Sequence, residues 1–206
     1  MFFKRKKSLC LSNKDIERLE QYIKENIGEF NNVFHEITSP DLHIDVVIIE
    51  PTKEQDYYTL VTMGMSAFKM PVPTNFGRVN RAELAIRLPK NWNIASNEEQ
   101  DYWPIRIIKE LARFPFYDNC FLADGHFIDW PNEFANTKYN SVVLNRLVKG
   151  PNCKLKNHDE VVIYNVIPLY ESEYKYLMEN GSNKFFEMAD DGILNDEIDI
   201  HRNKLI

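Results

Sequence analysis

The stretch that decides the fold is YTLVTMGMSAFKM, residues 58–70. Its first half is rich in threonine, valine and leucine, which favour a pleated, half-buried surface, so we expect a buried strand that ends in a sharp turn. Gly64 permits a close backbone approach or a bulge that a side chain would block. Met63, Met65 and Met70 surround this turn. Because methionine fills cores and also lines promiscuous binding surfaces, the turn is open to both interpretations.

Neighbouring segments are expected to build a sheet around this strand. Residues 42–50 start with alternating apolar and polar residues and become continuously apolar, as in a strand that enters a core. A short polar connection then leads into residues 58–70, which predicts an antiparallel hairpin. Residues 81–88 predict another strand, since alternate apolar residues share one face. Shorter strands are expected at residues 32–37, 119–130, 141–144 and 161–167, and Pro168 is expected to end the last of them.

Four helices are predicted, at residues 13–27, 97–114, 171–180 and 183–189. The first is preceded by Ser12, a good N-cap, and followed by Gly28, a natural C-terminal stop. Pro104 lies inside the second helix, so we expect a short acidic turn followed by a main helix that begins near this proline. Pro115 is expected to end that helix.

No internal repeat, low-complexity segment or convincing linker divides the chain. We therefore predict a single α+β domain over residues 1–206, with a mixed, largely antiparallel β-sheet and helices packed on it. Its core is expected at about residues 30–190, with mobile tails at 1–8 and 191–206.

The composition indicates a globular protein with a mild negative charge. Of its 206 residues, 44% are hydrophobic and 27% charged, and the net charge is −6. This balance argues against nucleic-acid binding, which needs a basic face to neutralise phosphates. The basic segment 4–7 is either a solvated terminus or a nucleic-acid arm, and we favour the solvated terminus.

Neither a membrane segment nor a disulfide framework is predicted. The longest apolar runs, such as residues 46–49, are too short to span a bilayer, and the first residues do not form a signal peptide. The three cysteines, Cys10, Cys120 and Cys153, are widely separated. A reducing compartment is the simpler interpretation, so we expect a cytoplasmic protein.

Motifs for nucleotide, cofactor or metal binding are missing from the sequence. It contains no glycine-rich dinucleotide motif, no P-loop and no nucleophile elbow, and we predict no cofactor. His43 and Asp45 share one face of a predicted strand. They lack a visible third ligand, so an exposed strand face is favoured over a metal site.

A second histidine stands beside two carboxylates, in Asp124-Gly125-His126 with Asp129 nearby. Gly125 lets the chain turn, and a neighbouring carboxylate could fix the tautomer of His126. A recognition or acid–base histidine and a polar hinge in a strand are both open. The enzymatic alternative is a hydrolase, or another enzyme, that uses a His126/Asp124 pair.

Several segments together resemble the suppressor of fused family, in its bacterial single-domain form. Their order and spacing extend from about residue 40 to residue 180. They are YYTLVTMGMS (57–66), MPVP (70–73), RAEL (81–84), WPIR (103–106), LARFP (111–115), GH (125–126) and VIPLY (166–170). Within them, Trp103 and Arg106 are interpreted as core and ion-pair residues.

The resemblance implies a domain like the N-terminal domain of the animal proteins, with a binding function and no catalysis. Animal members hold a zinc-finger transcription factor through a short peptide that adds as a strand between two domains, using backbone hydrogen bonds and side-chain pockets. A second domain is not evident in this sequence, so the animal partner is not carried over. Bacterial relatives are thought, from their genomic settings, to include immunity proteins. The predicted partner is therefore another protein or an extended peptide, and a toxin domain is one candidate.

The resemblance also places the peptide-facing end of the domain. The order Asp-Gly-His replaces the Gly-Asp-His of the animal motif, which moves the carboxylate relative to the imidazole. The turn at Gly64 is a candidate for one wall of this end. The predicted partner-binding residues are Phe114, Asp124, Gly125, His126, Met63, Gly64 and Met65. No catalytic residue is predicted, and the sequence gives neither the identity of the partner nor the oligomeric state.

Overall fold

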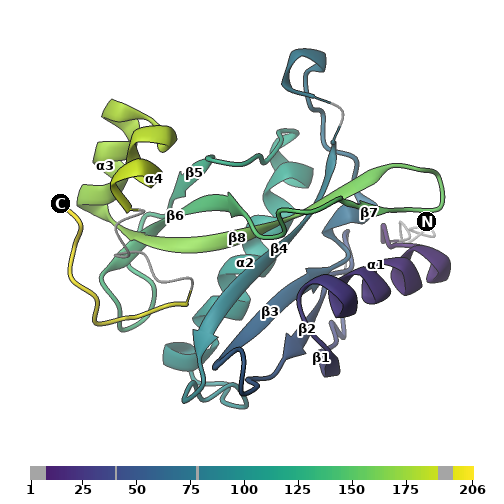
Figure 1. The fold of residues 1–206 in the computed structure, drawn as a ribbon, viewed down its shortest axis with the longest axis horizontal. Coiled ribbons are helices and arrows are strands. Elements are labelled where there is room, and N and C mark those ends of the chain that lie inside the picture. Colours follow the sequence, from purple (N-terminus) through teal and green to yellow (C-terminus); the bar gives the residue numbers. More distant parts are fainter. Residues whose placement is uncertain (1–7, 40, 78, 190–196) are drawn as a thin grey trace, which may run out of the picture.

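A computed structural model describes residues 8–39, 41–77, 79–189 and 197–206 of the protein, in which one eight-stranded sheet carries four α-helices (Figure 1). The strands are β1 (Phe30–Phe34), β2 (Asp45–Ile49), β3 (Tyr57–Met63), β4 (Arg81–Pro89), β5 (Phe127–Asp129), β6 (Tyr139–Arg146), β7 (Cys153–Lys154) and β8 (Glu160–Tyr170). The helices are α1 (Asn13–Asn26), α2 (Glu99–Asp118), α3 (Glu171–Asn180) and α4 (Ser182–Ala189), with two 3₁₀ turns, η1 (Met65–Ala67) and η2 (Thr74–Phe76). The basic segment 4–7 and much of the tails expected at 1–8 and 191–206 lie outside the described residues.

The sheet is mixed and largely antiparallel, as predicted. Its strand order is β1-β2-β3-β4-β8-β6-β5, and β7 pairs with β8 beside this path. The predicted hairpin is confirmed, because β2 and β3 pair antiparallel with Val47 opposite Val61. β4 and β8 pair in parallel, and the other pairings are antiparallel.

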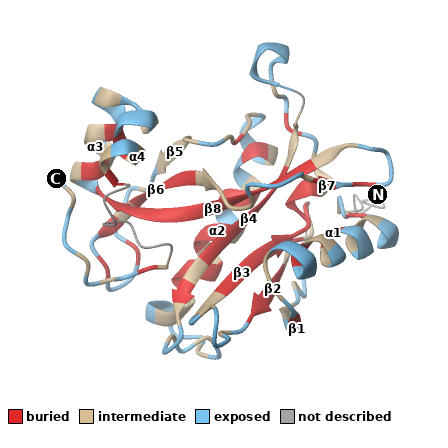
Figure 2. Ribbon diagram, viewed as in Figure 1, coloured by how far each residue is buried: buried red, intermediate tan, exposed pale blue. Residues whose placement is uncertain are grey.

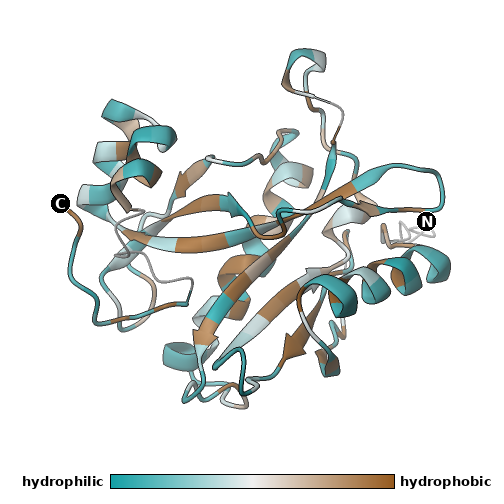
Figure 3. Cartoon of the chain, viewed as in Figure 1, coloured by the Kyte–Doolittle hydropathy of each residue, from teal (hydrophilic) through white to brown (hydrophobic). Residues whose placement is uncertain are grey.

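The two faces of the sheet are covered by different helices (Figure 1). Alternate strand residues such as Val47 and Val61 pack with Leu19 of α1, and the residues between them, such as Leu60, pack with Ile108 of α2. Side chains alternate between the faces of a strand, so burial on both faces explains why residues 46–49 of β2 are continuously apolar. Figure 2 shows the resulting buried strands, and Figure 3 shows hydrophobic residues gathered on them while the outward turns of α1 are hydrophilic.

The first helix forms as predicted, whereas the second is one continuous helix. The backbone N–H of Asp15 donates to Ser12 Oγ at the start of α1, which confirms the cap. α2 runs unbroken through Pro104 and Pro115, so the predictions of two pieces and of an end at Pro115 were wrong. Its last turn is held by tertiary packing, because Phe116 lies edge-on against Phe68, 5.4 Å between ring centres.

Strand lengths near the other prolines and glycines also differ from the predictions. β8 continues through Pro168, although it was expected to end there. β4 pairs with β8 only as far as Asn165, so the later residues of β8 have a strand neighbour on one side only, which is β6. A proline there removes no ladder hydrogen bond. In the segment 119–130 only β5 is a strand, and the residues before it form a turn. Among the described residues, no helix combines the length and apolar content needed to cross a membrane.

A fully buried carboxylate fixes the turn after β3. Glu83 accepts hydrogen bonds from the backbone N–H groups of Gly64 (2.9 Å), Met65 (3.2 Å) and Ser66 (3.0 Å). It also accepts from the hydroxyls of Thr62 (2.7 Å) and Ser66 (2.6 Å). Burial raises the pKa of Glu83, and the hydrogen bonds from Thr62, Gly64 and Ser66 oppose that shift. Five donors on two oxygens match the acceptor-only character of a carboxylate.

The turn needs glycine at one position for steric reasons. Gly64 has φ +138°, and a Cβ atom built on it would lie 2.0 Å from the carbonyl oxygen of His43. The close backbone approach predicted for this glycine is therefore confirmed. β3 ends at Met63 and the chain passes directly into η1, so the alternative of a bulge within the strand does not apply.

We predict that Glu83→Gln lowers the free energy of unfolding by about 2–3 kcal/mol, since an amide would present its own N–H donors to buried donors. Urea unfolding followed by circular dichroism measures this change. The matched control is Glu20→Gln on α1, which is expected to change stability by less than about 0.5 kcal/mol. Equal stability of the two variants would contradict the proposed role of Glu83.

Candidate functional site

The methionines of the predicted partner-binding set lie in the core. The exposed fractions of Met63 and Met65 are 7% and 2%, and the two residues belong to the clusters on opposite faces of the sheet. Gly64 between them is enclosed by the backbone of His43. These three residues therefore shape the turn after β3, and a direct contact with a partner stays a prediction.

The segment 124–126 extends the pairing of β5 with β6. The N–H of Gly125 donates to the carbonyl of Leu144, and the N–H of Leu144 donates to the carbonyl of His126, both at 2.8 Å. Gly125 has φ +77°, and a Cβ atom there would lie 2.5 Å from Oγ of Ser182, at the start of α4. This glycine therefore lets the segment pass close against α4.

Asp124 and His126 have different partners. Asp124 accepts a hydrogen bond from the backbone N–H of Arg146 at 2.8 Å. The ring of His126 lies 5.1 Å from the ring of Phe121. Burial lowers the pKa of His126, and a hydrogen bond with the backbone of Phe121 opposes this shift. The contacts described for Asp124 and His126 do not join the two side chains, and an acid–base role for them stays a hypothesis.

Phe114 lies on the exposed face of α2, beside a pocket of about 490 Å³. We call it the α2 pocket; its lining residues are Glu36, Tyr102, Arg106, Lys109, Glu110, Arg113, Phe114, Tyr117 and Asp118. The exposed fraction is 36% for Phe114 and 59% for Tyr117. Exposed aromatic rings beside arginine side chains are typical of the centres of protein interfaces.

Ion pairs hold the basic side chains of the α2 pocket in place. Arg106 pairs with Glu99 at 2.6 Å and with Glu110 at 3.2 Å, which confirms its predicted ion-pair role. Glu36, from the loop after β1, pairs with Arg113 and with Lys109, the latter at 3.5 Å. The positive charges are thus balanced within the pocket, so the pocket suits a mixed aromatic and polar contact better than a highly charged one.

Hydrogen bonds and cations outweigh burial at Glu36. Burial raises the pKa of this carboxyl. Hydrogen bonds from Ser39 Oγ and the N–H of Ile44, together with the charges of Lys109 and Arg113, outweigh burial and bring the pKa below its ordinary value of 4.5. Its charged form therefore stabilises the folded state above that pH, and the contribution is lost as the pH falls through the lower folded-state pKa.

Ser39, His43 and Asp45 form a contact chain where the loop between β1 and β2 meets β2. His43 Nδ1 lies 2.8 Å from Ser39 Oγ, and His43 Nε2 lies 3.1 Å from Asp45 Oδ1. The Ser39 hydroxyl donates to Glu36, so its proton points away from the histidine. A nucleophile would instead donate to its base. The set therefore clamps the loop to β2.

His43 and Asp45 share one face of the chain, as predicted, and His35 contacts the other oxygen of Asp45 at 3.1 Å. Burial raises the pKa of Asp45, but a hydrogen bond from the N–H of Glu36 and the two histidines bring it below its ordinary value. Across the part of the chain that the structure describes, no group of three or more His, Cys, Asp or Glu residues is arranged to hold a metal ion.

Sequence reasoning named Phe114 but missed the residues that surround it. Arg106, Lys109, Arg113 and Tyr117 follow one another at three- and four-residue intervals, which places them on one face of a helix. That signal was hidden because the helix was expected to end at Pro115, before Tyr117. Glu36 carries no local signal, since it reaches the pocket from a distant loop.

We predict that Glu36→Gln lowers the free energy of unfolding by about 1–3 kcal/mol at pH 7, because Arg113 and Lys109 lose a partly buried carboxylate. The difference from the unsubstituted protein should shrink as the pH falls below 4.5, where the carboxylate takes up a proton. Urea unfolding between pH 7 and pH 3 measures both effects.

The control for this prediction is Glu29→Gln, whose side chain is 80% exposed. An exposed carboxylate contributes little, so a change below about 0.5 kcal/mol is expected at every pH. A pH-independent loss of stability in Glu36→Gln would show that the charge of Glu36 is not what matters.

Comparisons with known proteins extend over most of the chain. The family model described as Suppressor of fused protein (SUFU) matches residues 40–203. An uncharacterized protein of Ureaplasma parvum serovar 3 (strain ATCC 700970) is 26% identical over 178 residues, which cover 81% of this chain and 84% of that protein.

Solved structures share the fold at low sequence identity. The suppressor of fused homolog from Neisseria gonorrhoeae FA 1090 is similar with a TM-score of 0.65 at 13% identity, over 94% of this chain and 95% of that one. The Sufu–Fu complex gives 0.68 at 12% identity, over 97% and 93%. Drosophila Suppressor of Fused gives 0.54 at 11% identity, over 84% of this chain but 45% of that one. Identities this low show a common fold alone.

Proposed function

This chain belongs to the suppressor of fused family, and on that premise we propose that it is a protein-binding domain, without enzymatic activity, whose partner docks on the α2 pocket. The observation that carries the proposal is the pair of exposed aromatic rings, Phe114 and Tyr117, on a helix that is itself firmly packed. Large rigid aromatic side chains contribute much contact area at low entropic cost when they are covered. In the Sufu–Fu complex a suppressor of fused protein is likewise bound to another protein.

The proposal includes a second surface, formed by the other predicted residues. His126 and Asp124 lie on a segment that continues the edge of the sheet beyond β5. An extended peptide that runs along such an edge gains backbone hydrogen bonds, with side-chain pockets supplying specificity. The turn after β3 supports this part of the sheet from inside the core, through Met63, Gly64 and Met65.

The proposed biological role is that of an immunity protein that neutralises a toxin domain in the cytoplasm. The net charge of −6 supports a basic partner, because complementary charge speeds association. Three cysteines that form no disulfide suit a reducing compartment. The alternative of a hydrolase is less well supported, since Asp124 and His126 bind different backbone groups.

The test is a binding measurement with the protein encoded by the neighbouring gene. We expect a complex at micromolar concentration, and we expect Phe114→Ala to weaken it roughly thirtyfold, as for an interface residue worth about 2 kcal/mol. Isothermal titration calorimetry measures the affinity, and thermal unfolding checks that the variant is folded.

The matched control is Met178→Ala on α3, an exposed apolar residue away from the α2 pocket. It should leave the affinity unchanged. No complex with the neighbouring gene product would contradict the immunity role, and equal losses in the two variants would contradict the α2 pocket as the docking site.

A further inference from the structure

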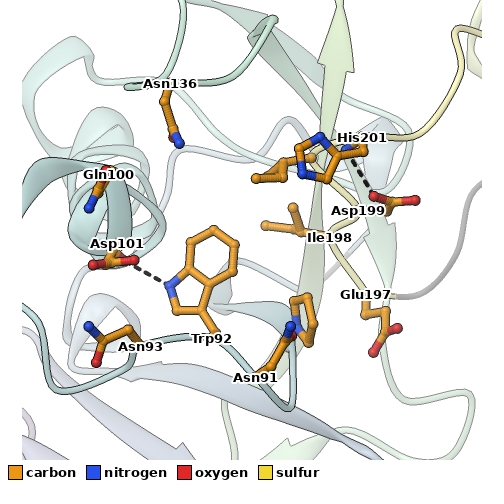
Figure 4. Close-up of a pocket in the computed structure, with 12 residues that line it drawn as sticks. Asn91, Trp92, Asn93, Gln100, Asp101, Asn136, Glu197, Ile198, Asp199 and His201 are labelled. Carbon is orange, nitrogen blue, oxygen red and sulfur yellow. Dashed lines mark hydrogen bonds between the residues drawn. The ribbon is translucent and has the colours of Figure 1, made fainter.

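A second pocket, of about 570 Å³, opens at the other end of α2 (Figure 4). We call it the acidic pocket; its lining residues are Pro89, Asn91, Trp92, Asn93, Gln100, Asp101, Asn136, Glu197, Ile198, Asp199, Ile200 and His201. Asp101 and Phe114 are separated by ~20 Å along α2, at ~1.5 Å per residue. Tyr102, next to Asp101, lines the α2 pocket, but no residue lines both pockets, so the two are separate sites.

Two distant parts of the chain form the walls of this pocket, and Asn136, from the connection between β5 and β6, also lines it. One wall is the turn after β4 together with the first turn of α2, and the other is the segment 197–201. That segment is fixed to the sheet, because the N–H of Ile198 donates to the carbonyl of Arg87 at 2.9 Å. The hydroxyl of Tyr139 also donates to the carbonyl of Asp199 at 2.5 Å.

The charge of the lining is negative. The lining residues include Asp101, Glu197 and Asp199, and neither lysine nor arginine is among them. The carboxylate of Asp199 accepts the backbone N–H of His201 at 2.8 Å (Figure 4). Of the two basic residues next to these segments, Lys90 pairs with Asp56 and Arg202 pairs with Glu173, each at 2.5 Å, and Lys90 also interacts electrostatically with Glu197. The pocket therefore disfavours an anionic ligand and favours a cationic one.

An indole ring forms the floor of the pocket. Nε1 of Trp92 donates to the carbonyl of Asp101 at 2.8 Å, which fixes the ring and satisfies its polar atom. Behind it, the ring of Trp103 lies edge-on at 6.2 Å. Figure 4 shows Asn136 and His201 across the pocket from Trp92. A fixed tryptophan ring is the strongest aromatic partner for a cation, and amide oxygens can accept its N–H groups.

We propose that the acidic pocket binds an organic cation that carries ammonium or guanidinium groups. Attraction to Asp101, Glu197 and Asp199 brings the cation to the pocket, and Trp92 contacts its apolar or charged surface. A free polyamine and the lysine or arginine side chain of a basic protein segment present the same chemistry. The site does not depend on the α2 pocket, so either proposal can fail without the other.

Calorimetry with two probes, spermidine and an acetylated tetra-arginine peptide, tests the proposal on the full chain at low ionic strength. We expect saturable binding of at least one probe, with one equivalent per chain. Tighter binding of spermidine would indicate a free polyamine as the ligand, and tighter binding of the peptide would indicate a protein segment. No saturable binding of either probe would overturn the proposal.

The decisive variant is Asp101→Asn/Glu197→Gln/Asp199→Asn, which removes three negative charges and preserves side-chain size. It should weaken binding at least tenfold. The matched control is Glu17→Gln/Glu20→Gln/Glu25→Gln on α1, which removes the same charge far from the pocket and should leave the affinity nearly unchanged. Equal weakening in both triple variants would mean non-specific attraction and would overturn the site.

A further variant, Trp92→Leu, separates the indole from the carboxylates. It should weaken binding severalfold while the number of sites stays at one, because the carboxylates remain. Thermal unfolding of each variant confirms that the fold is intact. The single substitution Asp101→Asn provides the charge test if the triple variant is unstable.

Discussion

The hydrogen bonds to Glu83 join β3, the turn η1 and β4 beyond the last backbone pair of β3 with β4. The carboxylate, on β4, accepts from the last residues of β3 and from the turn η1 that follows. At the same place the Thr62 hydroxyl accepts the N–H of Leu84, where the pairing of β3 with β4 has already ended. A side-chain network thus replaces the backbone ladder, and it carries the chain out of the sheet without leaving buried donors unpaired.

Arg81 completes this arrangement two residues before Glu83. Its guanidinium donates to the carbonyls of Ser66 and Ala67, at 2.7 Å and 3.1 Å, and to Asp159 at 2.8 Å. The backbone N–H groups of the turn therefore donate to Glu83, and the carbonyl groups of the turn accept from Arg81; both side chains come from β4. Because Asp159 precedes β8, the same arginine ties the turn to the parallel partner of β4. The rigidity of this end follows from a few fully paired polar groups.

Local sequence rules predicted the parts of this fold that depend on periodicity. The strands β2, β3 and β4 and the helix α1 follow from apolar patterns and a serine cap, and the mixed sheet follows from their order. The same rules failed at Pro115 and Pro168, where tertiary packing and the absence of a strand neighbour decide the outcome. Glu83 carries no sequence signal of burial, because a glutamate in a strand is ordinarily a solvated residue.

The candidate sites were predictable only where a residue type or a helical interval marks them. Phe114 was predicted from the resemblance to the suppressor of fused family. Tyr117 lies three residues further along the same helix face. Asp101 and Asp199 are distant in sequence and line one pocket only because segment 197–201 returns to the end of β4. The α2 pocket extends along one side of α2 from Tyr102 to Asp118, and the acidic pocket adjoins the first turn of the helix. The other side of α2 is buried against the sheet around Ile108. Residues that line either pocket can therefore change a ligand or partner without disturbing the core behind them.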